Sequence, residues 1–244
     1  MSETLKASKS QKSRIISTVL SPALQLWLRS QVEQVEALQF NLMGGDRQIL
    51  SGHIPIVTVT ANHAVYQGLH FSRIQLEGTD IRVNLGQVIK GKPLKLLAPI
   101  PVVGQLLLQQ ANLQASLQAP LLSKALTELL DTLLKSDETT NPVDYLKVKQ
   151  VSWQQIDLDA GQLILRGNLA DADLSTAQVV IRAGLQLVTP SVLQLNPLQI
   201  QIEPVLPERN FPAFEIDLGS DVELQELTLL SGQLICGGRL NVIP

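Results

Sequence analysis

The sequence predicts an α+β fold in which two long amphipathic helices pack in strongly curved antiparallel β-sheets. Three observations lead to this prediction. One stretch, Ala119–Lys135, carries leucines around most of a helical surface. Much of the remaining chain alternates between apolar and polar residues, as half-buried strands do. A strand–turn–strand pattern also recurs along the chain, which predicts an elongated molecule made of two helix-then-sheet halves.

The helix predicted at Ala119–Lys135 has a wide apolar surface. Ala119-Pro120 suits a helix start, because proline is tolerated in the first turn. The leucines and alanines that follow cover an arc of roughly 220°, and Lys124, Glu128 and Asp131 share the rest. A surface helix on an ordinary core needs a narrower stripe. We therefore expect a curved sheet to cover this helix on more than one side.

An earlier helix is predicted from about Ile16 or Ser21 to Ala37. Ser21 followed by Pro22 is a typical N-cap and first-turn pair. Apolar residues recur on one face with helical spacing, and this face is narrower than that of the later helix. These residues are Leu20, Leu24, Trp27, Leu28, Val32, Val35 and Leu38.

Glutamine recurs at the outward positions of the predicted strands. Examples are the words LQL at 185–187, LQL at 193–195 and LQIQI at 198–202. Successive side chains of a strand point to opposite faces, so one sheet face is expected to be apolar and the other polar but largely uncharged.

A repeated hairpin pattern relates residues 151–169 to residues 222–240 at a constant offset of 71 residues. Gly161-Gln162-Leu163-Ile164 and Gly232-Gln233-Leu234-Ile235 are identical words in the two copies. Glycine supplies the positive φ that such turns need. The alternative is that amphipathic hairpins resemble one another without a common repeat.

The domain organisation follows from this repeat. We predict a single domain over residues 15–244, made of two pseudo-repeats at about 15–118 and 119–244, after a disordered basic tail at 1–14. The apolar run after the tail is too short for a signal peptide, and no run is long enough for a transmembrane helix. We therefore expect a cytoplasmic protein that is peripheral at the membrane.

No motif for catalysis, cofactors or metal ions is found, and the net charge of −3 gives no reason to expect nucleic acid binding. The three histidines, His53, His63 and His70, match no ligand spacing. Cys236 lacks a nucleophile signature and indicates a small buried side chain. The acidic residues between 157 and 173 lack the compact loop that calcium needs. We predict no enzyme activity, no catalytic residue, no metal site and no cofactor.

The aliphatic composition predicts a ligand of variable shape. Flexible leucines suit an acyl chain better than a ligand held by fixed polar contacts. The candidate lipid-binding residues are Leu122, Leu126, Leu129 and Leu133 in the later helix and Leu24, Trp27 and Leu28 in the earlier one. A fully packed core that leaves no groove is the alternative interpretation.

A lysine-rich loop within residues 86–104 is the candidate membrane contact. Lysines are attracted to anionic lipid, and exposed leucines can enter the headgroup region. The residues concerned are Lys90, Lys92, Leu94, Lys95, Leu96 and Leu97. The alternative is that these leucines fold back onto the core.

Several words of the sequence resemble the LmeA-like phospholipid-binding family. They are SPALQLWL, LSGHIP, AVYQGL, LEGTDIRVNLGQVIKGKPLKLLAPIPVVGQL and ANLQASLQAPLLSKALTELL. The resemblance runs from about Ser21 to the C-terminus and implies phospholipid binding at membranes or cell envelopes, without a catalytic set. At the level of the fold, the predicted arrangement also resembles tubular lipid-binding proteins.

The predicted function is non-enzymatic binding or shuttling of phospholipid at a membrane surface, through an aliphatic groove. The partners expected are an acyl-chain lipid and a membrane surface. The alternative function is a structural or interaction module that docks to a membrane-associated protein complex through its neutral, glutamine-rich sheet faces.

Overall fold

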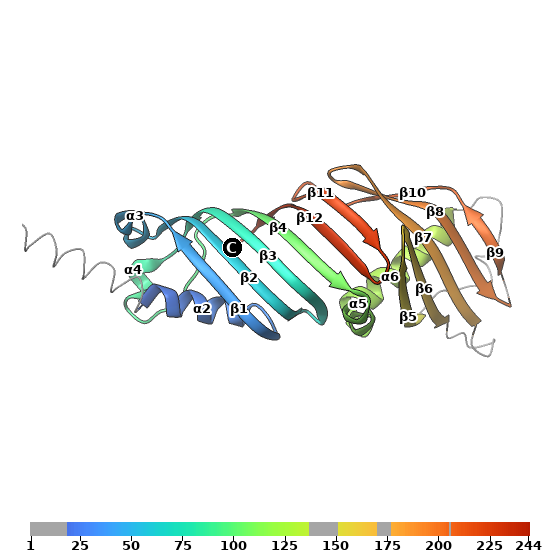
Figure 1. The fold of residues 1–244 in the computed structure, drawn as a ribbon, viewed down its shortest axis with the longest axis horizontal. Coiled ribbons are helices and arrows are strands. Elements are labelled where there is room, and N and C mark those ends of the chain that lie inside the picture. Colours follow the sequence, from blue (N-terminus) through green and yellow to red (C-terminus); the bar gives the residue numbers. More distant parts are fainter. Residues whose placement is uncertain (1–18, 137–150, 170–176, 205) are drawn as a thin grey trace, which may run out of the picture. The chain divides into compact units, whose positions relative to one another are not determined.

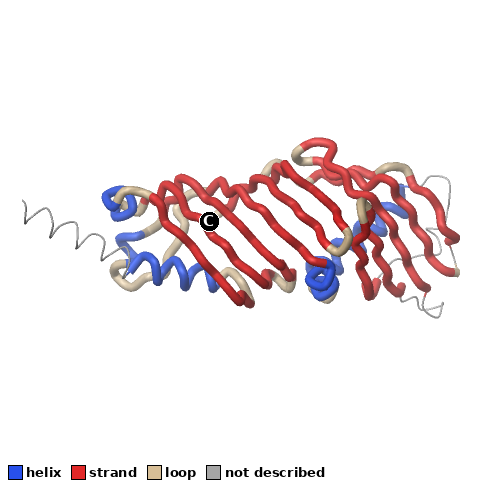
Figure 2. The backbone as a smooth tube through the Cα atoms, viewed as in Figure 1, coloured by secondary structure: helices blue, strands red, loops and turns tan. Residues whose placement is uncertain are grey.

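The computed structural model describes residues 19–136, 151–169, 177–204 and 206–244. Two antiparallel sheets dominate the fold, as Figures 1 and 2 show. Strands account for 60% of the described residues and helices for 22%, so the fold is mostly β.

The first sheet has the strand order β1-β2-β3-β4-β12-β11. Its strands are β1 (Gln34–Met43), β2 (His53–Tyr66), β3 (Leu69–Arg82), β4 (Ile100–Gln109), β11 (Val222–Leu230) and β12 (Gln233–Val242). Strands β2 and β3 are joined by Gln67 and Gly68, which both have positive φ. A two-residue turn of this kind matches the right-handed twist of the strands it joins.

The second sheet has the order β10-β8-β7-β6-β5, and β9 also pairs with β8. Its strands are β5 (Val151–Asp159), β6 (Gln162–Leu169), β7 (Ala177–Thr189), β8 (Val192–Glu203), β9 (Leu206–Phe211) and β10 (Phe214–Asp217). Strand β5 therefore ends the sheet on one side.

The described helices are short. They are α2 (Ser21–Ser30), α3 (Asp46–Leu50), α4 (Leu85–Val88), α5 (Gln110–Ser116) and α6 (Pro120–Ser136). The prediction of two long amphipathic helices packed in sheets is therefore wrong, because the described residues hold five short helices and two antiparallel sheets.

The earlier helix shows why that prediction failed. Helix α2 ends at Ser30, and strand β1 begins at Gln34 inside the range predicted as helical. Strand β1 pairs along its length with β2, for example Phe40 with Val59 and Leu42 with Val57. The alternation of Leu38, Phe40 and Leu42 with polar residues begins only at Leu38, since Val35 lies in the opposite phase. Pairing with β2 nevertheless extends back to Gln34, and this sheet pairing outweighs the helical spacing of Val32, Val35 and Leu38.

The strand boundaries also differ from the sequence expectations. The sequence pattern predicts two strands, His70–Glu77 and Thr79–Leu85, with Gly78 between them, but β3 runs through this glycine without interruption. A Cβ at position 78 would lie 3.2 Å from Ile81 Cδ1 and 3.4 Å from Ile100 Cγ2. Gly78 thus gives room to neighbouring isoleucines and does not mark a turn. The turn-forming residues SDETTNP at 136–142 predict a linker, and this segment lies almost wholly outside the described residues.

The chain forms two compact units, each with its own apolar core. Unit 1 holds the chain up to Tyr66, Arg73–Gln105 and Gly238–Pro244, and unit 2 holds Gln67–Ser72 and Leu106–Gly237. The core of unit 1 includes Leu20, Leu24, Ile54, Val83, Leu85 and Leu94. The core of unit 2 includes Leu130, Leu133, Trp153, Leu169, Ile200 and Ile202.

Candidate functional site

Helix α6 lies against the second sheet in unit 2 and buries one side (Figure 1). Leu130, Leu133 and Leu134 are buried in the core of this unit. The indole Nε1 of Trp153 in β5 donates a hydrogen bond to Thr127 Oγ1 at 3.2 Å. A buried tryptophan needs a partner for its N–H, so this bond fixes the rotation of α6 on the sheet.

The opposite side of α6 is charged. Lys124 Nζ lies 3.7 Å from Glu128 Oε1, and Lys135 Nζ lies 2.5 Å from Asp131 Oδ2. Both pairs have the i, i+4 spacing that places side chains on one face of a helix. These exposed pairs contribute little to stability, but they mark the face of α6 that meets water.

Between these two sides runs an apolar band, which we call the α6 flank. It consists of Leu121, Leu122, Ala125, Leu126 and Leu129. Leu121 is 52% exposed and Ala125 is exposed, whereas Leu122, Leu126 and Leu129 are half-buried and pack against the core of unit 2. At about 100° per residue, the flank spans roughly 140° of the helix, and the described residues leave part of it uncovered.

The structure therefore treats the four predicted lipid-binding leucines of this helix differently. Leu122, Leu126 and Leu129 retain accessible surface in the α6 flank, whereas Leu133 is fully buried and belongs to the core. Other half-buried apolar residues pack against the same core. They are Leu113, Leu163, Leu185, Phe214, Ile216 and Leu234.

Helix α2 of unit 1 separates its predicted residues in the same way. Leu24 is buried in the core of this unit, while Trp27 and Leu28 are half-buried and pack against it. Leu26, which falls outside the predicted apolar face, is exposed to solvent. Trp27 and Leu28 are therefore the accessible members of the predicted set in α2.

The lysine-rich loop in unit 1 follows α4 and is organised by Asn84. The Asn84 side chain donates from Nδ2 to Pro93 O at 3.0 Å, and its Oδ1 accepts from Lys95 N at 2.7 Å. The Asn84 carbonyl also accepts from Val88 N at 3.1 Å in the first turn of α4. One nearly buried amide thus ties the two ends of the loop together.

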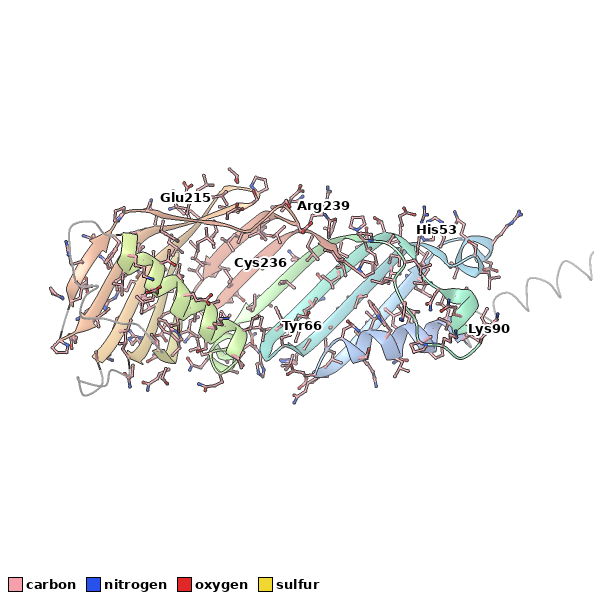
Figure 3. The ribbon with its side chains drawn as sticks, turned by 180° about the vertical axis from the view of Figure 1, so that it is seen from behind. His53, Tyr66, Lys90, Glu215, Cys236 and Arg239 are labelled. Atoms are coloured by element: carbon pink, nitrogen blue, oxygen red, sulfur yellow. The ribbon has the colours of Figure 1, made fainter. Side chains whose placement is uncertain are left out.

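This arrangement displays the lysines and divides the leucines. Lys90, Lys92 and Lys95 are exposed. Leu94 is buried in the core of unit 1, Leu96 is half-buried, and Leu97 is 62% exposed. Of the three leucines predicted to contact a membrane, Leu97 alone is strongly exposed. Ile89, which does not belong to the predicted membrane-contact set, is 54% exposed beside Lys90. Figure 3 labels Lys90 next to α4.

Helix α5 covers the free edge of the second sheet with two glutamines. Leu158 N donates to Gln110 Oε1 at 3.0 Å, and Ile156 N donates to Gln114 Oε1 at 2.9 Å. Gln114 Nε2 in turn donates to the carbonyl of Gln154 at 2.5 Å. An open edge strand is a site for unwanted pairing, and these amides occupy its backbone groups.

A short polar cluster holds α5 against β3 within unit 2. Ser72 Oγ donates to Asn112 Oδ1 at 2.7 Å and accepts from Gln109 N at 2.8 Å. Ser116 Oγ donates to Asn112 O and accepts from His70 N, both at 2.8 Å. Because every buried hydroxyl here has its partners, the cluster serves packing and leaves no polar group for a ligand.

The described residues contain no group of three or more histidine, cysteine, aspartate or glutamate side chains that could hold a metal ion. His53 Nε2 lies 2.6 Å from Asp80 Oδ1, and His63 Nε2 lies 4.0 Å from Glu36 Oε2. Both are separate pairs with exposed partners.

Cys236, labelled in Figure 3, lies on β12 and is a free thiol. Burial raises its pKa, and the negative charge of Glu226 raises it further. A raised pKa keeps the thiol protonated, which is the opposite of what a nucleophilic cysteine needs.

Accessible apolar side chains therefore occur in both units, in the α6 flank of unit 2 and at Trp27 and Leu28 of unit 1. Such surfaces are typical of proteins that bind lipids or apolar partners. The chain belongs to the LmeA-like phospholipid-binding family, whose family model matches residues 12–239. The resemblance stated from the sequence words is thereby confirmed.

Searches of curated proteins and of solved structures gave no match. No helix among the described residues has both the length and the apolar character that a bilayer crossing requires.

Proposed function

We propose that the protein binds phospholipid without chemical conversion and carries it at a membrane surface. The α6 flank is the single observation that carries this proposal. Leu121 and Ala125 are exposed beside Leu122, Leu126 and Leu129, which are half-buried, so one apolar band extends from the core toward the surface. Acyl chains would lie along this band.

The driving force would be apolar burial. Each methylene removed from water contributes about 0.8 kcal/mol, so eight methylenes on the band would contribute roughly 6 kcal/mol before the cost of association. Leucine side chains adapt to chains of different length and unsaturation. In unit 1, Trp27 and Leu28 would offer a second apolar contact.

The charged residues of α6 suit this role, because they border the band only on the side away from the core. Lys124 and Glu128 pair with each other, and so do Lys135 and Asp131. No carboxylate therefore has to be desolvated when a hydrocarbon chain settles beside Leu122 and Leu126. The aliphatic groove predicted from the sequence stays a prediction, and the proposal needs only an uncovered apolar band.

The alternative function, docking to a membrane-associated protein complex, would use the glutamine-rich sheet faces. The structure offers less support for it. Gln199 Nε2 donates to Asn210 Oδ1 at 3.0 Å, and Gln194 Nε2 donates to Glu215 Oε1 at 3.3 Å. Gln201 Nε2 likewise donates to Glu203 Oε1 at 2.7 Å. These amides are occupied by neighbours, which lowers the gain from binding a partner.

The test is the lipid content of the purified protein. The full chain is expressed in a lipid-containing host and examined by native mass spectrometry, with extraction and identification of bound lipid. We expect phospholipid on the wild-type protein. A Leu122→Gln/Leu126→Gln variant should lose at least about tenfold in lipid occupancy, because two amides on the band must be desolvated.

Two further variants separate binding from folding. Leu121→Gln/Ala125→Gln changes only exposed positions, so it should fold normally and still carry less lipid. Val188→Gln/Leu230→Gln changes two other exposed apolar residues of unit 2 and should keep the wild-type lipid content. A wild-type protein without lipid that also fails to take up phospholipid from vesicles would overturn the proposal.

A further inference from the structure

The lysine-rich loop lies in a part of the sequence that has no negative charge. No aspartate or glutamate occurs between Asp80 and Glu128, although the whole chain has a net charge of −3. The basic residues of this interval are Arg82, Lys90, Lys92, Lys95 and Lys124. Three of them belong to one loop, so the positive charge is concentrated against the overall balance of the molecule.

The three loop lysines are not used for internal ion pairs. Within the described part of the chain, the carboxylates pair with other side chains, namely His53, His63, Lys124, Lys135, Arg166 and Arg182. Lys90, Lys92 and Lys95 therefore present their full charge to solvent. An external anion would meet no competing carboxylate from this loop.

The loop backbone is held in one conformation before any partner arrives. Lys92 N donates to Gln87 O at 3.1 Å, and Leu97 N donates to Arg82 O at 2.9 Å. Val83 and Leu96 form an antiparallel bridge, and Leu94 is buried beneath the loop. Binding would therefore cost little backbone entropy.

We infer that the loop formed by residues 89–97 docks the protein onto the surface of an anionic phospholipid bilayer. This inference rests on the proposed function and adds the element that meets the membrane and the charge of the lipid it selects. Lys90, Lys92 and Lys95 bind the phosphate layer, while Ile89 and Leu97 enter the headgroup region. Each lysine near an anionic surface contributes about a fivefold gain in binding.

The combination of side chains favours a bilayer over an acidic protein. A bilayer surface offers many mobile phosphates above an apolar layer, and it rewards lysines and aliphatic side chains side by side without a fixed geometry. Lysine is a point charge on a flexible stem, in contrast to arginine with its planar fork for fixed carboxylates. The loop holds three lysines and no arginine.

Vesicle flotation with the full chain tests the inference. The wild-type protein and each variant are mixed either with vesicles of neutral phosphatidylcholine or with vesicles that also contain about 30 mol% of the anionic phosphatidylglycerol. We expect Lys90→Gln/Lys95→Gln to lower partitioning onto the anionic vesicles by about 30-fold. The matched control Lys124→Gln/Lys135→Gln also removes two positive charges, and it should change partitioning less than about threefold.

The depth of insertion provides a second measurement. Leu97→Cys in a Cys236→Ser background is labelled with an environment-sensitive fluorophore, and Gln39→Cys on an exposed position of β1 serves as the control site. We expect a blue shift at position 97 with anionic vesicles, reversed by about 0.5 M salt, and none at position 39. The inference would be overturned if Lys90→Gln/Lys95→Gln and Lys124→Gln/Lys135→Gln partitioned equally onto anionic vesicles. The absence of a fluorescence blue shift at position 97 would overturn it as well.

The lipid content measured by native mass spectrometry distinguishes the two proposals. Protein that carries phospholipid but binds anionic vesicles independently of the loop lysines would leave the proposed function standing and refute the docking loop. Loop-dependent flotation of a protein that never carries phospholipid would do the reverse. Failure to bind any vesicle, with capture of an acidic protein instead, would refute the bilayer as the partner.

Discussion

Gly161 and Gly232 lie in two hairpin turns, and each glycine donates a backbone hydrogen bond to the strand that leads into the other turn. Gly161 N donates to Leu229 O at 3.2 Å, and Gly232 N donates to Leu158 O at 2.9 Å. The same offset of 71 residues relates Gly161 to Gly232 and Leu158 to Leu229. The contact is therefore self-complementary, as in an interface around a local two-fold axis.

Replacing either glycine should weaken this contact through the backbone. Both have positive φ, +77° and +76°, and a Cβ at either position would meet no atom within 4 Å. Alanine at one position should therefore cost about 1–2 kcal/mol of unfolding free energy from conformation alone, and asparagine less. Urea denaturation of Gly161→Ala, Gly161→Asn and Gly232→Ala measures this.

The double variant shows whether the two turns act together. Gly161→Ala/Gly232→Ala should depart from additivity by at least about 0.5 kcal/mol, because each turn supplies the other's acceptor. Gly219 has φ +83° and an equally open Cβ direction, but it takes no part in this contact. Strict additivity in both Gly161→Ala/Gly232→Ala and Gly161→Ala/Gly219→Ala would contradict the coupling.

The hydrogen bonds between the α5 glutamines and the β5 backbone, which we call the glutamine seal, should each make a measurable contribution to stability. Gln114→Ala removes two hydrogen bonds to the β5 backbone and should cost about 1–3 kcal/mol, since Ile156 N loses its partner. Gln110→Ala should act in the same way on Leu158 N. Amide hydrogen exchange should accelerate at Ile156 in Gln114→Ala and at Leu158 in Gln110→Ala, and it should stay unchanged in β6 and β7.

Gln118→Ala is the control for this series, because Gln118 is exposed and its side chain makes no hydrogen bond within the described residues. We expect its stability to stay within about 0.5 kcal/mol of wild type. Unchanged exchange at Ile156 in Gln114→Ala would show that the seal contributes nothing.

The leucines of α6 should divide into two classes of stability effect. Leu130→Ala leaves a cavity in the core of unit 2 and should cost about 2–5 kcal/mol. Leu121→Ala removes an exposed side chain and should cost less than about 0.5 kcal/mol. Denaturant titration of both variants tests this, and similar losses would mean that the α6 flank is covered.

The Cys236 thiol should make stability fall at alkaline pH. Its pKa is raised in the folded protein, by burial first and by Glu226 second. As the pH rises above the unfolded pKa of about 8.5, the unfolded chain loses the proton while the folded chain keeps it. The free energy of unfolding therefore decreases until the folded thiol also ionises.

The difference between wild type and Cys236→Ser isolates this effect from other groups that titrate in the same range. We expect that difference to be flat below about pH 8 and to fall above it. Thiol alkylation at about pH 8.5 should also be slower than for a free cysteine, and Glu226→Gln should speed it up. A rising difference would reverse the assigned direction of the pKa shift.

Local patterns predicted single elements better than the arrangement of elements. Helix α6 begins at Pro120, one residue after the predicted start, because proline and the leucine spacing both act locally. The end of α2 was missed, because the choice between helix and strand for residues 31–37 depends on pairing with β2. The fold class failed for the same reason.

The site was predictable where exposure follows from charge. Lys90, Lys92 and Lys95 are exposed, but the sequence could not tell that Leu94 is buried while Ile89 and Leu97 are not. That difference depends on Asn84, which joins the start of α4 to Pro93 and Lys95. Likewise, nothing local marks Gln110 and Gln114 as partners of β5, more than forty positions away. The pseudo-repeat boundaries and the cytoplasmic location stay predictions.

The chemistry of the amides on α5 has a consequence for the conditions the protein can tolerate. Gln110 and Gln114 do not titrate, so the bonds that they give Ile156 and Leu158 should persist in acid and in strong electrolyte alike. Carboxylates in those places would become protonated in acid and lose these hydrogen bonds, and the edge of β5 would then be open to pairing with another strand. Because glutamine is neutral, the protection of the β5 edge should not change with pH or salt concentration.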